Sequence, residues 1–282
     1  ISVENVSLVF PLYGRAYQSE AAPANPYESA AAPHDERIIH GRDGRIIGVK
    51  ALTDISFSLK SGDRLALIGA NGSGKTTLLQ ILVGILTPDR GQVRVRGRAS
   101  NLININLGMR PEASGHRNIT LRSLAAGHTS EEIEEKREEI AAFSELGEFL
   151  DMPIETYSAG MRMRLNFAIA TAYKPEILIL DEWISAGDAA FRTKASQRMQ
   201  EFVAEAGILV LASHSRQMLM ENCERCIWLD RGRIRADGPV QSIIEAYEAE
   251  VAPQTDAAAK AERRARRKSA REIGRASCRE RV

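Results

Sequence analysis

The sequence predicts an α/β fold built on a mostly parallel β-sheet. Short apolar runs, each the length of a buried strand, alternate with longer segments whose apolar residues recur at helical spacing. A glycine-rich loop, GANGSGKTT over 69–77, lies between one such run and a helix-forming segment. With 282 residues, 44% hydrophobic and 27% charged, the chain can bury one large core or two modest ones. We therefore expect a parallel sheet with this loop at its carboxyl edge.

The first part of the chain predicts strands on either side of a polar excursion. Residues 3–10 and 52–59 alternate apolar and polar side chains, as half-buried strands do. The segment over 14–44 between them is rich in Ala, Pro and charge, with too few apolar residues for a core, so we expect a mobile surface excursion. The alternation over 92–100 predicts another strand.

The remainder predicts helices that alternate with buried strands. A Thr/Ser cap, followed by acidic residues and apolar positions at helical spacing, predicts a helix over 129–146. The later elements are expected in the order strand 176–182, helix 192–205, strand 207–214, helix 216–222, strand 226–234 and helix 239–250. We assign 1–250 to one domain, and 251–282 to a basic, Ala-rich tail without an apolar face, which we expect to be disordered.

Composition argues against several kinds of protein. Lys and Arg number 38 against 37 Asp and Glu, so no basic surplus predicts a nucleic-acid partner. No uninterrupted apolar run approaches the ~18 residues of a membrane helix, so we expect no transmembrane segment of the chain's own. Three cysteines are too few for a disulfide framework. Cys223 and Cys226 form a CxxC without a second pair of zinc ligands, and we interpret them as part of a helix-to-strand junction.

The loop over 69–77 has the residue types that bind a nucleotide phosphate. Its glycines allow backbone angles closed to other residues, so successive N–H groups can turn toward phosphate oxygens at the positive end of the next helix. Lys75 adds a charge for the outer phosphates, and the Thr76 hydroxyl is placed to ligate Mg²⁺. A merely tight turn would need neither. We expect phosphate contacts from Gly69, Ala70, Asn71, Gly72, Ser73, Gly74, Lys75, Thr76 and Thr77.

Polar residues at the ends of two buried strands predict the rest of a hydrolytic site. Phosphoryl transfer needs a carboxylate for Mg²⁺ and a base for the attacking water. The run ILILDE places Asp181 beside the phosphate loop and Glu182 just beyond it, facing the γ-phosphate. His214 ends the next buried strand at the same sheet edge, within reach of the γ-phosphate. We interpret Asp181 and Thr76 as metal ligands, Glu182 as the base, and His214 and Lys75 as catalytic partners.

Together these motifs resemble the ATPase subunit of an ABC transporter. The resemblance covers the chain to about residue 250 and includes YSAGMRMRLNFAIA over 157–170, which is similar to the family's signature motif. It implies a P-loop NTPase fold of ABC type with an antiparallel β subdomain, an inserted helical subdomain at about 106–172, and ATP and Mg²⁺ as ligands. It further implies that Ser158 and Gly160 bind the γ-phosphate of ATP held by the opposite subunit, that Asp188 contacts the partner, and that Phe10 stacks on adenine.

Departures from the family pattern indicate one branch. Ala159 and Met161 stand where the commonest signature has Gly and Gln, and the family's coupling glutamine would fall near Ile105, between Asn104 and Asn106. Three stretches nonetheless resemble the ATPases that drive export of O-antigen, capsule and teichoic-acid polymers: 102–119, 157–168 and 185–191. The departures therefore indicate a specialised exporter. Two interpretations of Asn104 and Asn106 stay open: one of them takes the place of the glutamine, or both only cap a turn.

The resemblance implies ATP-driven export of a lipid-linked polysaccharide. Two copies would close as a homodimer over two ATP molecules and act on a separate transmembrane permease, at the cytoplasmic face of the bacterial inner membrane. Alternatives are an ABC exporter of a drug or lipid, a soluble ABC ATPase acting on ribosomes or DNA, and a non-catalytic nucleotide-binding module. The intact Lys75, Asp181, Glu182 and His214 disfavour the last of these. The sequence leaves open which polymer is exported and what residues 14–48 do.

Overall fold

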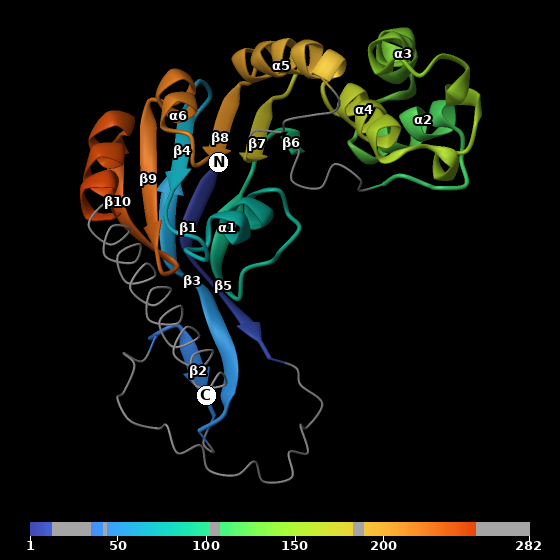
Figure 1. Ribbon diagram of the computed structural model, residues 1–282. Helices are drawn as coiled ribbons and strands as arrows, with labels where there is room; N and C mark the ends of the chain where they lie inside the picture. Colours follow the sequence, from blue (N-terminus) through green and yellow to red (C-terminus); the bar gives the residue numbers. More distant parts are fainter. Residues whose placement is uncertain (13–34, 42–43, 102–107, 183–188, 252–282) are drawn as a thin grey trace, which may run out of the picture.

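The computed structural model describes residues 1–12, 35–41, 44–101, 108–182 and 189–251. Its strands are β1 (Ser2–Pro11), β2 (Ile38–His40), β3 (Ile46–Ser58), β4 (Arg64–Ile68), β5 (Arg90–Arg94), β6 (Ala99–Asn101), β7 (Ile177–Asp181), β8 (Ile208–Ala212), β9 (Arg225–Asp230) and β10 (Arg233–Pro239). They form a six-stranded sheet in the order β10-β9-β4-β8-β7-β6 and a four-stranded sheet in the order β2-β3-β1-β5. Figure 1 shows the helices of the middle of the chain gathered to one side of both sheets.

The helices and short helical turns are α1 (Lys75–Leu82), α2 (Gly115–Ala125), α3 (Ser130–Ser144), η1 (Gly147–Asp151), η2 (Ile154–Thr156), α4 (Ala159–Ala170), α5 (Ala189–Ala204) and α6 (Arg216–Asn222). Residues 240–251 are also helical. The predicted cap of α3 is confirmed, because Thr129 Oγ1 accepts from the Glu132 N–H while Glu132 Oε2 accepts from the Thr129 N–H. Helix α2 was not predicted, since only a few apolar residues mark its buried face.

The six-stranded sheet is parallel except for β10, which is antiparallel to β9. Strands β4, β7 and β8 are buried on both faces, which explains why their sequences are continuous apolar runs. One face, with Leu65 and Leu67 of β4, packs against α1 and the four-stranded sheet, while the other, with Ala66 and Ile68, packs against α5 and α6. The carboxyl ends of these strands therefore meet at one rigid edge, as the sequence predicted.

The four-stranded sheet is antiparallel throughout, and helices α2, α3 and α4 form a third core of their own. Tyr157 lies in that core and donates its hydroxyl hydrogen to the Phe149 carbonyl oxygen. The predicted combination of a mostly parallel sheet, an antiparallel β part and inserted helices is therefore present. The strand predicted within 92–100, however, is wrong as a single element. It divides into β5, which pairs with β1, and β6, which pairs with β7. Gly97, at φ +116°, lies where the chain crosses between the sheets.

Two further predictions need correction. The strand expected over 226–234 is a hairpin of β9 and β10, because Arg231 and Gly232 both adopt positive φ and make a tight reversal. The excursion expected over 14–44 contains β2, which pairs with β3. Of that segment, residues 14–34 and 42–43 lie outside the described residues. Cys223 and Cys226 are free and buried between α6 and β9, at the expected helix-to-strand junction.

Candidate functional site

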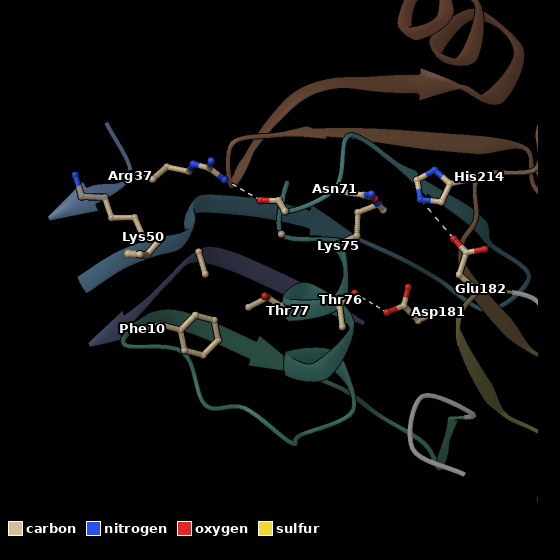
Figure 2. Close-up of a pocket in the computed structure, with 14 residues that line it drawn as sticks. Phe10, Arg37, Lys50, Asn71, Lys75, Thr76, Thr77, Asp181, Glu182 and His214 are labelled. Atoms are coloured by element: carbon tan, nitrogen blue, oxygen red, sulfur yellow. Dashed lines mark hydrogen bonds and ion pairs between the residues drawn. The ribbon is translucent and has the colours of Figure 1, made fainter. Parts of the chain in front are cut away.

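Polar side chains from several strand ends line a cleft of 510 Å³ at the carboxyl edge of the six-stranded sheet. This volume lies within the usual range for small-molecule sites. The lining residues are Phe10, Arg37, Val49, Lys50, Ala51, Asn71, Gly72, Gly74, Lys75, Thr76, Thr77, Asp181, Glu182 and His214. Figure 2 shows Phe10, Lys50 and Arg37 at one end, Asp181, Glu182 and His214 at the other, and Lys75 and Thr76 between them.

The phosphate loop connects β4 to α1, and its glycines adopt backbone angles that strain any residue with a Cβ. Gly69 has φ +148°, and a Cβ there would lie 2.2 Å from the Leu229 carbonyl oxygen. Gly74, at φ +105°, would place a Cβ 2.9 Å from the Ala51 carbonyl oxygen. The loop is therefore packed tightly against β3 and β9 on its outer side. Among the described residues, the buried Ser73 hydroxyl has no hydrogen-bond partner, which suits a loop that receives a polar ligand.

The Lys75 side chain, at the start of α1, folds back against the phosphate loop and is buried. This side chain is 8% exposed, and Nζ donates to the carbonyl oxygens of Gly69 at 2.7 Å and Ala70 at 3.2 Å. Burial lowers the pKa of Lys75, while the nearby carboxylates of Asp181 and Glu182 oppose that shift. Within the described residues, the hydrogen bonds of Nζ go to neutral carbonyl oxygens, so a phosphate group that approached Lys75 would supply a charged partner for this buried cation.

Thr76 and Asp181 meet across the cleft. The Thr76 Oγ1 hydroxyl donates to Asp181 Oδ2 at 2.6 Å, which joins the first turn of α1 to the end of β7. Within the described ranges, no group of three or more His, Cys, Asp or Glu side chains could hold a metal ion. Mg²⁺ usually takes only one or two carboxylate ligands and completes its shell with water and substrate phosphates. The Thr76 and Asp181 oxygens therefore fit Mg²⁺ bound together with a phosphate, and they do not form a complete metal site alone.

Glu182 and His214 face each other at the same end of the cleft. His214 Nε2 lies 3.6 Å from Glu182 Oε1, and both side chains are more than half exposed. Glu182 has φ +69°, a conformation that is unfavourable for a residue with a Cβ, while its N–H donates to the Ala212 carbonyl oxygen of β8. Strained backbone of this kind is frequent at functional sites, where it directs a side chain. Here it accompanies a carboxylate that lines the cleft.

The structure adds two cations that the sequence did not predict. Arg37 precedes β2 and Lys50 lies in β3, and both line the cleft near Phe10. Phe10, at the end of β1, is 43% exposed, so its ring is available to a ligand. The apolar pair Ile38 and Ile39 was the local signal for β2, and pairing of β2 with β3 brings Arg37 to the loop.

Other predicted residues lie away from the cleft or outside the described ranges. Ser158 is the N-cap of α4, where its Oγ accepts from the Met161 N–H at 3.2 Å. Ser158 and Gly160 do not line the cleft of this chain. Asp188 lies outside the described residues, as do Asn104 and Asn106, the two candidates for the coupling position. The structure therefore brings together the phosphate loop, both acids, His214 and Phe10, and it leaves the signature segment apart.

Comparison with known proteins identifies the family. The model of the ABC transporter family matches residues 52–185. An O-antigen export system ATP-binding protein of Yersinia enterocolitica is 40% identical over 231 residues, which cover 82% of this chain and 94% of that protein. The chain belongs to the ABC transporter family. A teichoic acids export ATP-binding protein of Lactococcus lactis is 40% identical over 198 residues, which cover 70% of this chain and 42% of that longer protein.

Solved structures support the fold of an ABC cassette. A dimeric ATP-binding cassette in a post-hydrolysis state with ADP and phosphate superimposes with a TM-score of 0.57 at 18% sequence identity, covering 85% of this chain and 98% of that one. The resemblance and the fold class predicted from the sequence are thus confirmed. Among the described residues, no helix combines the length and apolar character needed to cross a membrane.

Proposed function

We propose that the chain is the ATP-hydrolysing subunit of an ABC exporter that powers transfer of a lipid-linked polysaccharide, such as O-antigen or capsule, across the cytoplasmic membrane. The main support is a single observation: Lys75, Thr76, Asp181, Glu182 and His214 line one cleft in a chain that is 40% identical to an O-antigen export ATP-binding protein over most of both lengths. The cargo assignment follows the names of the O-antigen and teichoic-acid export relatives.

The cleft suits ATP from one end to the other. Phe10 offers an exposed ring for stacking on adenine at one end. The loop over 69–77 offers backbone N–H groups and the start of α1 for the phosphates, and Lys75 supplies a positive charge to the outer ones. This arrangement leaves the γ-phosphate nearest Asp181, Glu182 and His214.

Hydrolysis requires that water attack the γ-phosphorus while the bond to the bridging oxygen of ADP breaks. Glu182 would accept the proton of the attacking water, and His214, 3.6 Å away, would hold the γ-phosphate in line. Thr76 and Asp181 would hold Mg²⁺, and the bound ion would neutralise the charge that develops on the phosphate oxygens. Lys75 would stabilise the same charge from the loop side.

A second copy of the chain would complete the site. Ser158 is the N-cap of α4, and Gly160 lies in its first turn. The N–H groups at this end of α4 can bind an anion, yet Ser158 and Gly160 do not line the cleft of their own chain. We propose that this segment contacts the γ-phosphate of ATP held by the partner, and that Asp188 also contacts the partner. The dimeric state of the related cassette with ADP and phosphate supports this arrangement.

The exporter would also need a separate transmembrane permease, with this chain at the cytoplasmic face of the bacterial inner membrane.

The proposed function is tested by a gene deletion combined with chemical analysis of the polysaccharide. Deleting the gene should remove the surface polysaccharide and leave lipid-linked polymer inside the cell. The wild-type chain should restore export, whereas Glu182→Gln should not. Unchanged surface polysaccharide in the deletion strain would favour the alternative, an exporter of a drug or another lipid.

A further inference from the structure

Two hydrogen bonds from distant segments of the chain hold carbonyl groups of the phosphate loop. Arg37, just before β2, donates from Nη1 to the Gly72 carbonyl oxygen at 2.8 Å. The Gly232 N–H, in the turn between β9 and β10, donates to the Ser73 carbonyl oxygen at 2.9 Å. Figure 2 shows the first of these contacts as a dashed line from the Arg37 guanidinium to the loop. Two successive carbonyl groups of the loop are therefore fixed from outside.

Asp35 holds the Arg37 side chain in place. Arg37 Nε lies 3.0 Å from Asp35 Oδ1, and Nη2 lies 2.6 Å from Oδ2, so the carboxylate takes one side of the guanidinium fork. The Arg37 N–H also donates to Asp35 Oδ1 at 3.1 Å. These bonds lower the pKa of Asp35 to about 2, so the carboxylate stays charged at neutral pH. The remaining nitrogen, Nη1, is the one directed at Gly72.

The direction of these carbonyl groups sets the direction of the loop's N–H groups. In a trans peptide the C=O and N–H bonds point in opposite directions. Because the Gly72 carbonyl points toward Arg37 and the Ser73 carbonyl points toward Gly232, the Ser73 and Gly74 N–H groups point away from these donors. The Ser73 N–H agrees with this, since it donates to the Ala70 carbonyl oxygen across the loop at 3.1 Å. The Gly74 N–H immediately precedes α1, where a phosphate would bind.

We propose that Arg37, fixed by Asp35, is a positioning residue of the nucleotide site: it holds the Gly72 carbonyl toward its own guanidinium, keeps the Ser73 N–H turned away from it, and thereby keeps the loop shaped for phosphate. Arg37 acts through the loop and is not a catalytic residue. The proposal rests on the proposed function, because it concerns the same cleft. It links nucleotide affinity to a segment, residues 35–40, that lies outside the phosphate-binding motif.

The test measures binding of ADP and of a non-hydrolysable ATP analogue to the purified chain by calorimetry in the presence of Mg²⁺. Arg37→Ala should weaken both ligands about tenfold, because a hydrogen bond from a charged donor is lost and the loop contacts phosphates that both ligands share. Arg94→Ala is the matched control, since this exposed arginine of β5 contacts Gln92 and should leave both affinities unchanged.

Second variants separate positioning from general damage. Asp35→Asn should weaken both ligands by a smaller factor, and it should have no further effect once Arg37 is Ala. Arg37→Lys should restore part of the affinity, because an ammonium can still donate to the Gly72 carbonyl. If Arg37→Ala does not fold, Asp35→Asn and Arg37→Lys make the same comparison.

Three results would overturn the inference: affinities within about twofold of wild type in a folded Arg37→Ala, a loss confined to the ATP analogue, which would mean direct contact with the γ-phosphate, or full additivity with Asp35→Asn. A wild-type chain that binds neither ligand would instead overturn the proposed function, together with this inference.

Discussion

The phosphate-loop region and the signature motif over 157–170 differ in their relation to the cleft of their own chain. Around the loop, Lys75, Thr76, Asp181, Glu182 and His214 already line one cleft. At the start of α4, Ser158 has a cap contact with Met161 but no place in that cleft. Under the proposed function, the first region would bind nucleotide within one chain, whereas the second would take part only with a partner. Substitutions in the two regions should consequently fail in different ways.

The largest effect is expected from Glu182→Gln. Turnover of ATP should fall by roughly 10² to 10⁴, the usual contribution of a general base, while ATP binding is preserved because the loop and Lys75 remain. Steady-state phosphate release and calorimetric binding measure the two quantities. Glu205→Gln, an exposed glutamate just beyond α5, is the control and should match wild type. Near wild-type turnover in Glu182→Gln would remove Glu182 from its proposed role.

Lys75→Ala should instead damage binding itself. The variant lacks the buried cation that would contact the phosphates. Nucleotide affinity should therefore fall by about 10- to 100-fold, which corresponds to the loss of a hydrogen bond between charged groups. Lys60→Ala removes an exposed lysine just beyond β3 and should leave affinity intact. An unchanged affinity in Lys75→Ala would contradict the assignment of the loop as the phosphate site.

Phe10→Ala should weaken nucleotide binding by about 1 to 3 kcal/mol through lost stacking, with little effect on turnover once ATP is saturating. Phe149→Ala provides a matched control, because Phe149 is a similarly exposed phenylalanine, at 54%, in η1. If both variants bind ATP equally well, adenine does not stack on Phe10.

Ser158→Ala should lower turnover about tenfold, because a hydrogen bond from the Ser158 hydroxyl to the charged γ-phosphate of the partner's ATP is lost. The variant also loses an N-cap, which costs about 1 kcal/mol of folding stability. Ser114→Ala separates the two effects, because Ser114 caps α2 through the Arg117 N–H in the same way. Both variants should melt at similarly lowered temperatures, yet only Ser158→Ala should reduce turnover. Equal turnover in the two would leave Ser158 with a capping role alone.

Several cleft residues could be located from the sequence because each lies at the end of a buried strand that a short stretch of sequence reveals. The loop over 69–77, Asp181, Glu182 and His214 each follow a buried apolar run, and parallel strands bring such ends to one edge. Arg37 was missed because it reaches the cleft only through pairing of β2 with β3, which a three-residue strand barely signals. Lys50 was missed because it lies in the first part of β3, before the strand predicted over 52–59. Likewise, the alternation over 92–100 is compatible with either sheet, so it could not predict the crossing at Gly97.

In the proposed ATP-bound dimer, two chains close over ATP and Ser158 of each contacts the nucleotide held by its partner. This arrangement is tested most directly by measuring the molecular mass of Glu182→Gln by light scattering with saturating ATP and Mg²⁺, alone and combined with Ser158→Phe. We expect a dimer for Glu182→Gln with ATP, a monomer without ATP, and a monomer for the double variant, which should still bind ATP in its own cleft. A Glu182→Gln chain that binds ATP yet stays monomeric, or a double variant that dimerises equally well, would contradict it.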